Sequence, residues 1–383
     1  MKCSFKDIVI DSRTGLNPRK NFVLGSGDNA YITIKDIYDG KINISDKTDR
    51  VDDAAIQIIK KRSRIAPGDI LFVSIGRIGE TAIVQEKDDS WDVNESVFIF
   101  TINDDIIIPE YFCLLFDSED VRNSLTKNSS GSTFKSIKMG QLERMEFDIP
   151  SLNEQKNIVD QINKIKSIRI ARIKELEQLD LLIKARFVEL FANCKNMVSL
   201  NDACSIITDG THQPPKFQDT GIPFIFVSNL ANNTVTYNAE KFISEETYAE
   251  LYRRTPIEIG DILLSTVGSY GHPAVVLEDR KFLFQRHIAY LKPKRDMINS
   301  FYLHGALLAP DGQRQIEEKV KGIAQKTLNL SEIRKIVIPL PGINEQNEFE
   351  SFVKQINKSK VAVQKALDET QILFDSLMQK YFG

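Results

Sequence analysis

Two long segments of the chain repeat hydrophobic residues at alternating spacings of three and four, the pattern of one helix face. They cover 153–193 and 344–383, and neither contains Pro or Gly before its last residue. Asn153 and Asn344 are expected at the N-caps, since a short side-chain oxygen can accept from the first free N–H groups. The glutamate after each then lies in the first turn, where negative charge favours the helix dipole.

The spacing in both segments follows one heptad register, which predicts a seam that packs on another helix. The predicted partner of each helix is the other one, and the alternative is that each helix packs on its own globular domain. The hydrophobic seam positions are Ile158, Ile162, Ile165, Leu176, Leu179, Ile183, Leu190, Phe349, Val353, Ile356, Val363, Leu367, Phe374 and Leu377.

The remaining sequence of each half predicts short strands and turns. The segments 31–37 and 224–230 are rich in β-branched and aromatic residues, which is typical of strands. A buried strand is expected at 70–73 and again at 262–265. Each is followed by a G-x-x-G turn and a second apolar run, which predicts a hairpin whose turn needs the backbone freedom of glycine.

These segments match because the chain is an internal duplication. Gly68-Asp69-Ile70-Leu71 returns as Gly260-Asp261-Ile262-Leu263, and Pro150-Ser151-Leu152-Asn153-Glu154-Gln155 returns as Pro341-Gly342-Ile343-Asn344-Glu345-Gln346. A period of about 190 residues is far longer than the 20–50 of solenoid repeats. The expected organisation is a mixed α+β domain at 1–150, a long helix at 151–195, a second such domain at 196–341 and a second long helix at 342–383.

Composition narrows the class of protein only slightly. The 383 residues are 42% hydrophobic and 27% charged, as in a folded globular protein of two ordinary domains, and the net charge is −3. Neither half is basic, so a positive surface for nucleic acid would have to be local or supplied by a partner. No apolar run approaches the roughly 18 residues of a membrane span, and no signal peptide is visible. A cytoplasmic protein without membrane contact is expected.

Cysteine and histidine usage gives no sign of a metal site. The four cysteines lie far apart without a C-x-x-C pair, which also argues against a disulfide framework and suits a reducing compartment: Cys3, Cys113, Cys194 and Cys204. The four histidines all lie in the second half, where a catalytic role would be missing from the other copy: His212, His272, His287 and His304. They are expected to face DNA or to lie in the core.

The arrangement resembles the specificity subunit of type I restriction-modification systems over nearly the whole chain. The resemblance rests on the paired P-x-φ-N-E-Q boxes at Pro150 and Pro341, each opening a long helix, with support from the G-D-I-L pair and the stretch from Gly131 to Lys135. It implies two target-recognition domains, each reading half of a bipartite DNA sequence. It also implies that the two helices form an antiparallel coiled coil, with the halves related by a pseudo-two-fold axis, that spaces the domains.

The same resemblance implies the partners of the chain. They are double-stranded DNA, two modification (methyltransferase) subunits and the ATP-dependent restriction subunits, with no cofactor bound by this chain itself. The sequence agrees with a non-catalytic subunit. Its one Pro-Pro, at 214–215, lacks the preceding Asn or Asp and the following aromatic residue of an adenine-methylation motif, and no phosphate-binding G-x-x-x-x-G-K-[ST] loop is present.

Candidate DNA contacts come from the polar loops and the local basic patches of the two copies. Base edges are read by side-chain donors and acceptors, while phosphates need Lys or Arg. The G-x-x-G turns contribute Arg77, Ser269 and Tyr270. The polar loop 208–214, which resembles a DNA-facing loop of the family, contributes Thr211 and His212, with Lys216 just after it, and its less clear counterpart at 13–20 contributes Arg19 and Lys20. The later polar stretches contribute Ser132, Thr133, Lys135, Gln325 and Lys326, and the basic patches contribute Lys61, Arg62, Arg253 and Arg254. The alternatives are a plain hairpin turn and a solvated charged face.

Divergence between the copies predicts the form of the DNA target. The loops differ while the boxes and helices match, so the two half-sites should differ and lie a fixed, unread distance apart. Helices of about 40 residues are about 60 Å long, enough to hold two domains about one DNA turn apart. The alternatives are the recognition subunit of a bipartite-site type II system that cuts on both sides, and a coiled-coil adaptor that binds only protein.

Overall fold

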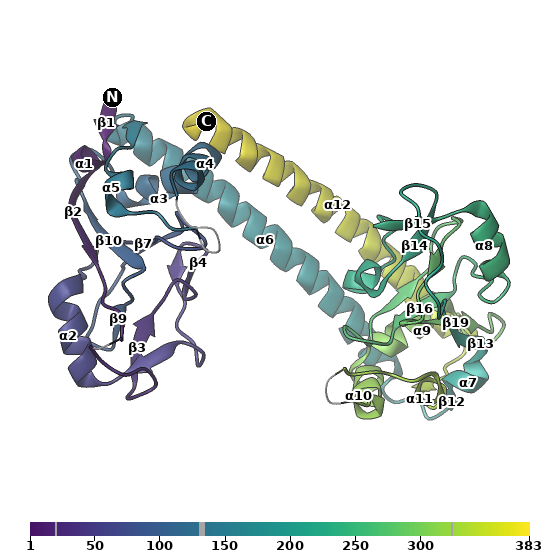
Figure 1. Ribbon diagram of the computed structural model, residues 1–383. Helices are drawn as coiled ribbons and strands as arrows, with labels where there is room; N and C mark the ends of the chain where they lie inside the picture. The colour runs from purple at the N-terminus through teal and green to yellow at the C-terminus, as the bar shows by residue number, and fades with distance from the viewer. Residues whose placement is uncertain (20, 130–134, 323–324) are drawn as a thin grey trace. The chain divides into compact units, whose positions relative to one another are not determined.

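A computed structural model describes residues 1–19, 21–129, 135–322 and 325–383 (Figure 1). The chain forms two compact units, which are described separately. Unit 1 contains 1–171 and 367–383, and unit 2 contains 172–366. Each long helix therefore contributes one part to each unit.

Unit 1 is built around a four-stranded antiparallel sheet in the order β2-β10-β7-β8. Smaller sheets pair β1 with β11, β4 with β5, and β3 with β6 and β9. The strands are β1 (Lys2–Ser4), β2 (Val9–Thr14), β3 (Asn29–Ile32), β4 (Ile37–Tyr38), β5 (Lys41–Ile42), β6 (Asp49–Val51), β7 (Ile70–Val73), β8 (Thr81–Ile83), β9 (Trp91–Val93), β10 (Val97–Ile102) and β11 (Glu146–Asp148). The helices are α1 (Phe5–Ile8), α2 (Asp53–Ser63), α3 (Pro109–Asp117), α4 (Glu119–Asn128), α5 (Met139–Leu142) and the first half of α6 (Leu152–Phe191).

Unit 2 has a four-stranded antiparallel sheet in the order β13-β19-β16-β17. It also pairs β12 with β20, and β14 with β15 and β18. The strands are β12 (Met197–Ser199), β13 (Cys204–Asp209), β14 (Ile222–Ile225), β15 (Lys241–Ile243), β16 (Ile262–Ser265), β17 (Pro273–Val275), β18 (Leu283–Phe284), β19 (Ile288–Pro293) and β20 (Val337–Pro339). The helices are the second half of α6, α7 (Leu200–Ala203), the 3-10 helix η1 (Val227–Asn233), α8 (Glu245–Tyr252), α9 (Ser300–Leu308), α10 (Pro310–Lys319), α11 (Leu330–Ile333) and most of α12 (Ile343–Phe382).

The two units repeat the same order of elements, which confirms the internal duplication and the α+β class. Each large sheet has the same strand order, and each three-stranded sheet contains one parallel pair, β3 with β9 and β14 with β18. The exception is the segment before α2 and α8, where unit 1 has the β4–β5 hairpin and unit 2 has η1. The duplication therefore preserves the sheets and changes a connection.

The predicted hairpins after the G-D-I-L segments are present in both units. β7 and β16 are fully buried strands, paired antiparallel to β8 and β17. Between them, Gly76 and Gly268 have φ of 75° and 74°, a left-handed conformation that favours glycine. These turns need their glycines, as predicted.

The predicted strands at 31–37 and 224–230 were wrong in their second halves. β3 ends at Ile32, and β14 ends at Ile225. In unit 1, the Asp36 carboxylate accepts from the backbone N–H of Thr33 at 2.8 Å, and in unit 2 the Asn229 side chain accepts from the N–H of Phe226 at 3.0 Å. These side-chain bonds close local turns that compete with the sheet ladder.

The predicted N-caps of the long helices were also wrong. α6 begins at Leu152, so Ser151 precedes it, and α12 begins at Ile343. The Glu154 carboxylate accepts from both the N–H and the hydroxyl of Ser151, at 3.0 and 2.7 Å, which forms a capping box. Glu345 likewise accepts from the N–H of Gly342 at 2.9 Å. The glutamate that both copies carry one residue after the asparagine therefore caps the start of each helix.

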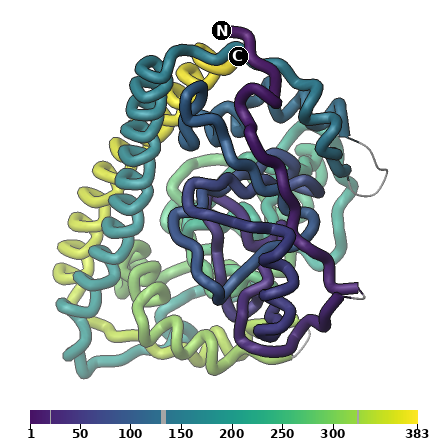
Figure 2. Tube along the Cα trace, turned by 90° about the vertical axis from the view of Figure 1, so that its left-hand side faces the viewer, coloured from purple at the N-terminus to yellow at the C-terminus, as the bar shows by residue number. Residues whose placement is uncertain are grey.

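In unit 1, the beginning of α6 runs beside the end of α12 (Figures 1 and 2). The Tyr381 hydroxyl donates to Gln161 at 3.2 Å, and Lys166 lies over the ring of Phe374 at 5.8 Å. Ile158 and Phe382 also join the core of unit 1. The helices are antiparallel here, and they pack both on each other and on their own domain.

In unit 2, the end of α6 meets the beginning of α12 in the same antiparallel sense. The rings of Phe187 and Phe349 lie 5.4 Å apart, and Lys360 is paired with Asp180 at 2.7 Å. Phe187 also contacts Tyr302 of α9, with ring centroids 5.3 Å apart. The sequence left two alternatives for each long helix, packing on the other helix or packing on its own domain. In the structure both occur together.

The predicted seam follows the burial pattern except at the end of α6. Leu190 is 40% exposed, while Phe187 and Phe191 on either side are buried. Phe191 is buried there because its ring packs on Tyr302 and Phe349 in the core of unit 2. The buried face of α6 is therefore displaced from the predicted seam at this end. The other predicted seam positions are buried or half-buried: Ile158, Ile162, Ile165, Leu176, Leu179, Ile183, Phe349, Val353, Ile356, Val363, Leu367, Phe374 and Leu377.

Candidate nucleic-acid interface

Two strands of the large sheet in unit 2 end at the same edge. Asp209, the last residue of β13, pairs with Ala289, and Ser265, the last residue of β16, pairs with Ile288. Ala289 and Ile288 are neighbours at the start of β19. The loops that follow β13 and β16 therefore leave the sheet side by side.

The turn that precedes β19 lies between these two loops. The N–H of Arg286 donates to the carbonyl of Thr211 at 3.1 Å, on one side of the turn. On the other side, the N–H of Thr266 donates to the carbonyl of His287 at 2.9 Å. We call residues 209–216, 266–271 and 285–287 the loop edge of unit 2.

Asp209 organises the charged side chains at one side of this loop edge. Its carboxylate accepts from His212 Nε2 at 2.8 Å and pairs with Arg254 at 3.2 Å. Gly210 follows, at a position where a Cβ would lie 2.2 Å from the carbonyl oxygen of Phe284. The close contact between Gly210 and the backbone of Phe284 fixes where the loop leaves the sheet. The contacts with Asp209 hold the side chains of His212 and Arg254 beside this loop.

The G-x-x-G turn at the other side meets the segment before α11. The N–H of Gly268 donates to the carbonyl of Lys326 at 3.3 Å. The Lys326 ammonium is paired with Glu317 at 2.9 Å, lies 3.2 Å from the Tyr270 hydroxyl and stands over its ring. Lys326 and Tyr270 are therefore anchored by one another and by Glu317.

Unit 1 has the same edge with the same backbone pattern. Thr14 ends β2 opposite Phe98, and Val73 ends β7 opposite Val97, at the start of β10. The N–H of Gly76 donates to the carbonyl of Lys135 at 3.0 Å, as Gly268 does to Lys326 in unit 2. We call residues 14–19, 74–79 and 94–96 the loop edge of unit 1.

The side chains at the loop edge of unit 1 are different. Arg62 donates to the hydroxyl of Thr14 at 3.1 and 3.2 Å, where unit 2 has the Arg254–Asp209 ion pair. Asn17 donates to the carboxylate of Glu95. The two edges thus share a frame and present different polar groups.

A family model supplies the comparison that decides the class of this chain. The type I restriction modification DNA specificity domain matches twice, at residues 3–180 and 195–370. The chain belongs to this family. It carries two DNA specificity domains, one for each half of the internal duplication.

Curated relatives of the chain are specificity subunits of type I restriction enzymes. The EcoBI subunit of Escherichia coli is 26% identical over 68% of this chain, and the match spans 62% of that protein. The MjaIX subunit of Methanocaldococcus jannaschii is 24% identical over 92% of this chain and 86% of its own length. The chain thus spans less than two thirds of one relative and most of the other.

Solved structures of type I systems share the fold. A chain from a study of assembly and conformational transition of the type I R-M system aligns with a TM-score of 0.63 at 19% identity, covering 100% of this chain and 97% of that one. The S subunit from M. genitalium aligns with a TM-score of 0.53 at 14% identity, covering 100% and 96%. The likeness is one of architecture.

In this specificity-domain chain, the predicted contact residues fall into three groups. The exposed side chains that form no hydrogen bond or ion pair with another described residue are Arg19, Lys61, Lys135, Lys216, Arg253, Ser269 and Gln325. The partnered ones are Arg62, Arg77, His212, Arg254, Tyr270 and Lys326, and Thr211 is held through its backbone. Lys20, Ser132 and Thr133 lie outside the described residues.

The predicted contact residue Arg77 is engaged within its own domain. Its guanidinium donates to the carbonyls of Ile34 and Ile37 at 2.9 and 3.0 Å and pairs with Glu80 at 3.3 Å. The side chain therefore ties the G-x-x-G turn to the segment after β3. Turn sequence alone does not reveal such a tether, because the carbonyls come from a distant segment.

Sequence reasoning missed two charged residues of the loop edges, Glu95 and Arg286. They occupy equivalent places in the turns before β10 and β19. The signal was a change of charge sign at aligned positions of the two copies. This change of charge indicates a role in binding only once the strand register shows that each turn lies between the two other loops of its loop edge.

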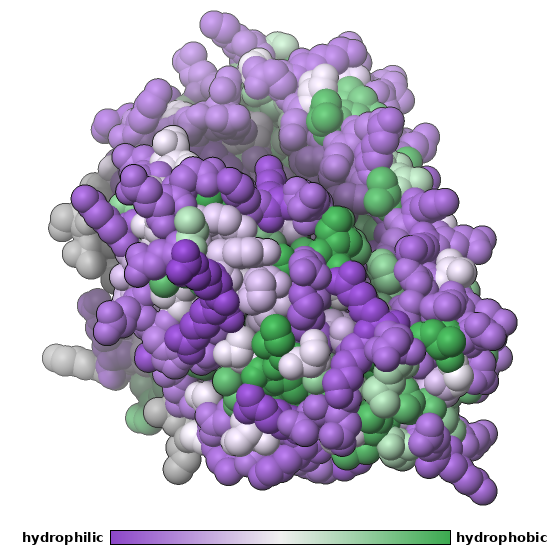
Figure 3. Space-filling model, turned by 90° about the vertical axis from the view of Figure 1, so that its right-hand side faces the viewer, coloured by the Kyte–Doolittle hydropathy of each residue, from purple (hydrophilic) through white to green (hydrophobic). Residues whose placement is uncertain are grey.

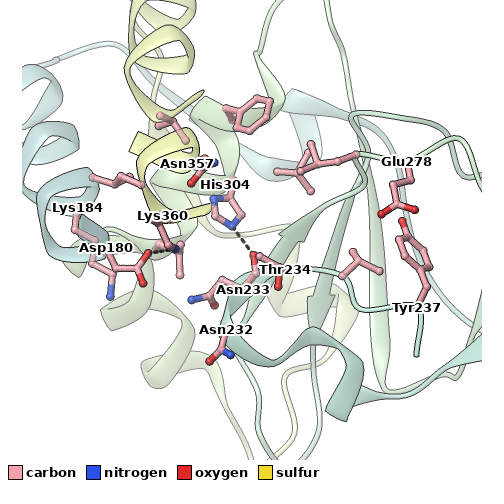
Figure 4. Close-up of a pocket in the computed structure, with 17 residues that line it drawn as sticks. Asp180, Lys184, Asn232, Asn233, Thr234, Tyr237, Glu278, His304, Asn357 and Lys360 are labelled. Atoms are coloured by element: carbon pink, nitrogen blue, oxygen red, sulfur yellow. Dashed lines mark hydrogen bonds and ion pairs between the residues drawn. The ribbon is translucent and has the colours of Figure 1, made fainter. Parts of the chain in front are cut away.

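Unit 2 also contains a cavity of about 230 Å³ against α6, α9 and α12 (Figure 4). On its wall, Asn232 and Asn233 have left-handed φ of 60° and 57°. His304 Nε2 lies 3.2 and 3.1 Å from the carbonyls of Asn233 and Pro273, and burial lowers the pKa of this histidine to about 4. A neutral His304 that donates to both carbonyls holds the strained turn in place, which is the core role expected of one histidine.

The surface of unit 2 is mostly hydrophilic on the face drawn in Figure 3, where hydrophobic side chains lie scattered. In the part of the chain that the structure describes, no helix has the length and apolarity to cross a membrane. Within the same residues, no three His, Cys, Asp or Glu side chains gather as metal ligands would.

Proposed function

We propose that the two loop edges of this chain each bind one half of a bipartite DNA sequence. The observation that carries the proposal is their shared backbone frame with different side chains. Equivalent hydrogen bonds, such as Gly76 to Lys135 and Gly268 to Lys326, place the same loops at both edges. The polar groups at equivalent places differ: Arg62 donates to the hydroxyl of Thr14, whereas Arg254 pairs with the carboxylate of Asp209. Two related readers with different side chains recognise two different half-sites.

The exposed cations around these edges suit phosphate contacts, because sequence-independent binding comes from neutralising phosphates. Arg253 is exposed and unpaired among the described residues, while its neighbour Arg254 is anchored to Asp209. The proposed phosphate contacts are Arg19, Lys20, Lys61, Arg62, Lys135, Lys216, Arg253, Arg254 and Lys326. The proposed polar contacts to bases or sugars are Ser132, Thr133, Thr211, His212, Ser269, Tyr270 and Gln325.

The long helices supply the spacing between the half-sites in this proposal. α6 and α12 each contain 40 residues, which corresponds to about 60 Å of helix. Their antiparallel pairing within both units supports a stiff connection. The resulting target has two short, different half-sites separated by a gap of fixed length that the protein does not read.

Two methyltransferase subunits are the proposed partners on the outer face of the helices, and ATP-dependent restriction subunits complete the assembly in the cytoplasm. Apolar side chains outside the seam support helix docking by a partner. In unit 2, Leu181 is 61% exposed and Leu182 is 46% exposed. Methylation and cleavage are carried out by these partners, and this chain selects the sequence.

Mapping methylated adenines tests the proposal. The chain is expressed with its methyltransferase subunit in a host that lacks adenine methylation, and the genome is sequenced for modified bases. The expected result is one asymmetric motif with two specified parts and a constant gap. A palindromic motif, or methylation that does not depend on this chain, would contradict recognition by two different domains. A complex that forms but selects no sequence would instead identify a protein-only adaptor.

A further inference from the structure

The turns before β10 and β19 have equivalent backbone hydrogen bonds. The N–H of Asn94 donates to Ile32 and that of Gln285 to Ile225, at 2.8 and 3.1 Å. At the end of each turn, the N–H of the first strand residue, Val97 or Ile288, donates to the carbonyl of the first turn residue at 3.1 Å. From the neighbouring loop, the N–H of Ser74 or Thr266 donates to the carbonyl of the last turn residue, at 3.1 and 2.9 Å respectively. Both turns are therefore held on both sides, in the middle of their loop edges.

The residues at the centre of these turns have opposite charges. Arg286 in unit 2 is exposed, whereas its counterpart in unit 1 is Glu95, which is half-buried. Equivalent backbone positions with opposite charge are difficult to explain by folding, because the backbone frame is the same. They are expected where two related domains must distinguish different ligands.

His287 restricts the Arg286 guanidinium. Arg286 Nε lies 3.4 Å from His287 Nε2, and this long hydrogen bond is the only side-chain bond of Arg286 to a described residue. Burial and the neighbouring Arg286 both lower the pKa of His287, so the imidazole is neutral and can accept. With Nε directed at the histidine, the two terminal nitrogens remain available as a planar pair of donors.

We propose that this turn carries the residue that selects one base pair in each half-site. Arg286 selects a guanine by a bidentate bond to its O6 and N7 atoms in the major groove, because that pair matches the guanidinium fork. Glu95, whose Oε2 already accepts from Asn17, selects through its other carboxylate oxygen a base that presents an amino donor, cytosine first, and is repelled by the two acceptors of guanine. This inference rests on the proposed reading of a half-site by each loop edge.

The cations that lie beside the loop edge of unit 2 are less suited to this role. Arg254 is bound to Asp209 and Lys326 to Glu317, so a base contact would cost an existing ion pair. Arg253 is the C-cap of α8 and lies outside the loop edge, which suits a phosphate contact. Among these residues, Arg286 combines a fixed backbone position with two terminal nitrogens that bond to no residue in the described part of the chain.

The test compares three variants in the complete complex with the methyltransferase: Arg286→Ala, Arg286→Lys and Arg253→Ala. The measurement is the DNA sequence motif that each complex methylates. Arg286→Ala is expected to relax one guanine of a single half-site, with a loss of discrimination of about 10- to 100-fold at that position. Arg286→Lys keeps the charge but not the fork and should lose most of the same discrimination. Arg253→Ala should leave the motif unchanged and weaken methylation at all sites evenly.

Three other outcomes would overturn the inference. If Arg286→Ala leaves the motif and its strength unchanged, the turn reads no base. If the variant weakens all sites evenly, as Arg253→Ala does, Arg286 contacts phosphate. If Arg286→Lys retains full discrimination, the bidentate fork is not used. A wild-type complex without any bipartite motif would contradict the proposed function itself, which separates that failure from the other three. Thermal melting of each variant checks folding, which should be unaffected because the side chain is exposed.

Discussion

The buried side chain of Gln346 accepts a hydrogen bond from the backbone N–H of Asn299 at 2.8 Å, and so joins the start of α12 to the start of α9. Its amide group donates to the carbonyls of Met297 and Pro341 at 3.2 and 3.0 Å. Gln155 makes the same three bonds in unit 1, with the N–H of Ile108 as its donor at 2.9 Å. The last residue of the P-x-φ-N-E-Q box therefore fixes each long helix to its domain.

Replacing Gln346 with leucine should destabilise unit 2. The substitution leaves one N–H and two carbonyls without their partner, and an unsatisfied buried polar group costs about 1–3 kcal/mol. We expect the free energy of unfolding of the full chain to fall by roughly 2–4 kcal/mol in urea denaturation. The matched control is Asn344→Ala, two residues earlier on an exposed position of the box. Equal losses for the two variants would show that the glutamine is not the fastening residue.

Gly210→Ala should disturb the loop edge of unit 2 at the point where it leaves the sheet. The new Cβ would lie 2.2 Å from the carbonyl oxygen of Phe284, so the backbone must shift. We expect a loss of about 1–3 kcal/mol in stability and weaker specificity in one half-site only. Gly140→Ala is the control, since a Cβ there meets nothing within 4 Å. A Gly210→Ala complex with unchanged stability and an unchanged motif would contradict the close approach.

His304 should make unit 2 less stable in mild acid. Burial lowers its pKa in the folded protein to about 4, below the unfolded value of 6.5. Its contribution is therefore complete above about pH 6.5 and is lost as the pH falls towards 4, because only the unfolded chain takes up the proton. The effect is at most about 3 kcal/mol, and less because part of the ring faces the cavity.

The measurement compares denaturation midpoints of wild-type protein and His304→Gln between pH 7.5 and about pH 5. The glutamine amide can still donate to the carbonyls of Asn233 and Pro273, so the variant keeps the contacts without the titrating ring. We expect the wild-type midpoint to fall more steeply with acid than that of the variant. Parallel pH profiles would exclude His304 as the titrating group.

Lengthening both long helices should change the gap between the half-sites. Seven residues inserted at equivalent seam positions of α6 and α12 preserve the heptad register and add about 10 Å. We expect the methylated motif to keep both half-sites and to gain about three base pairs between them. The control inserts the heptad in α6 alone, which mismatches the pair and should reduce activity. An unchanged gap in the double insertion would contradict spacing by the helices.

Much of the fold could be predicted from the sequence, because its elements follow from local sequence patterns that the duplication shows twice. The G-D-I-L strands, the glycine turns and the two long helices follow from apolar periodicity and from the needs of tight turns. The ends of elements were less accessible. The strand from Tyr31 stops at Ile32 because Asp36 bonds back to Thr33, and α6 starts at Leu152 because Ser151 and Glu154 form the cap.

By itself, the sequence determined the class of the molecule: two related α+β domains, two long helices and the segments that diverge between the copies. Only the tertiary structure decided which polar residues are available at the loop edges. Arg77 is held by the carbonyls of Ile34 and Ile37, whereas the side chain of Arg286, between two loops, bonds only to His287 among the described residues. The physical reason is that the partners of a side chain come from strands distant in sequence, so its availability depends on the register of the sheet.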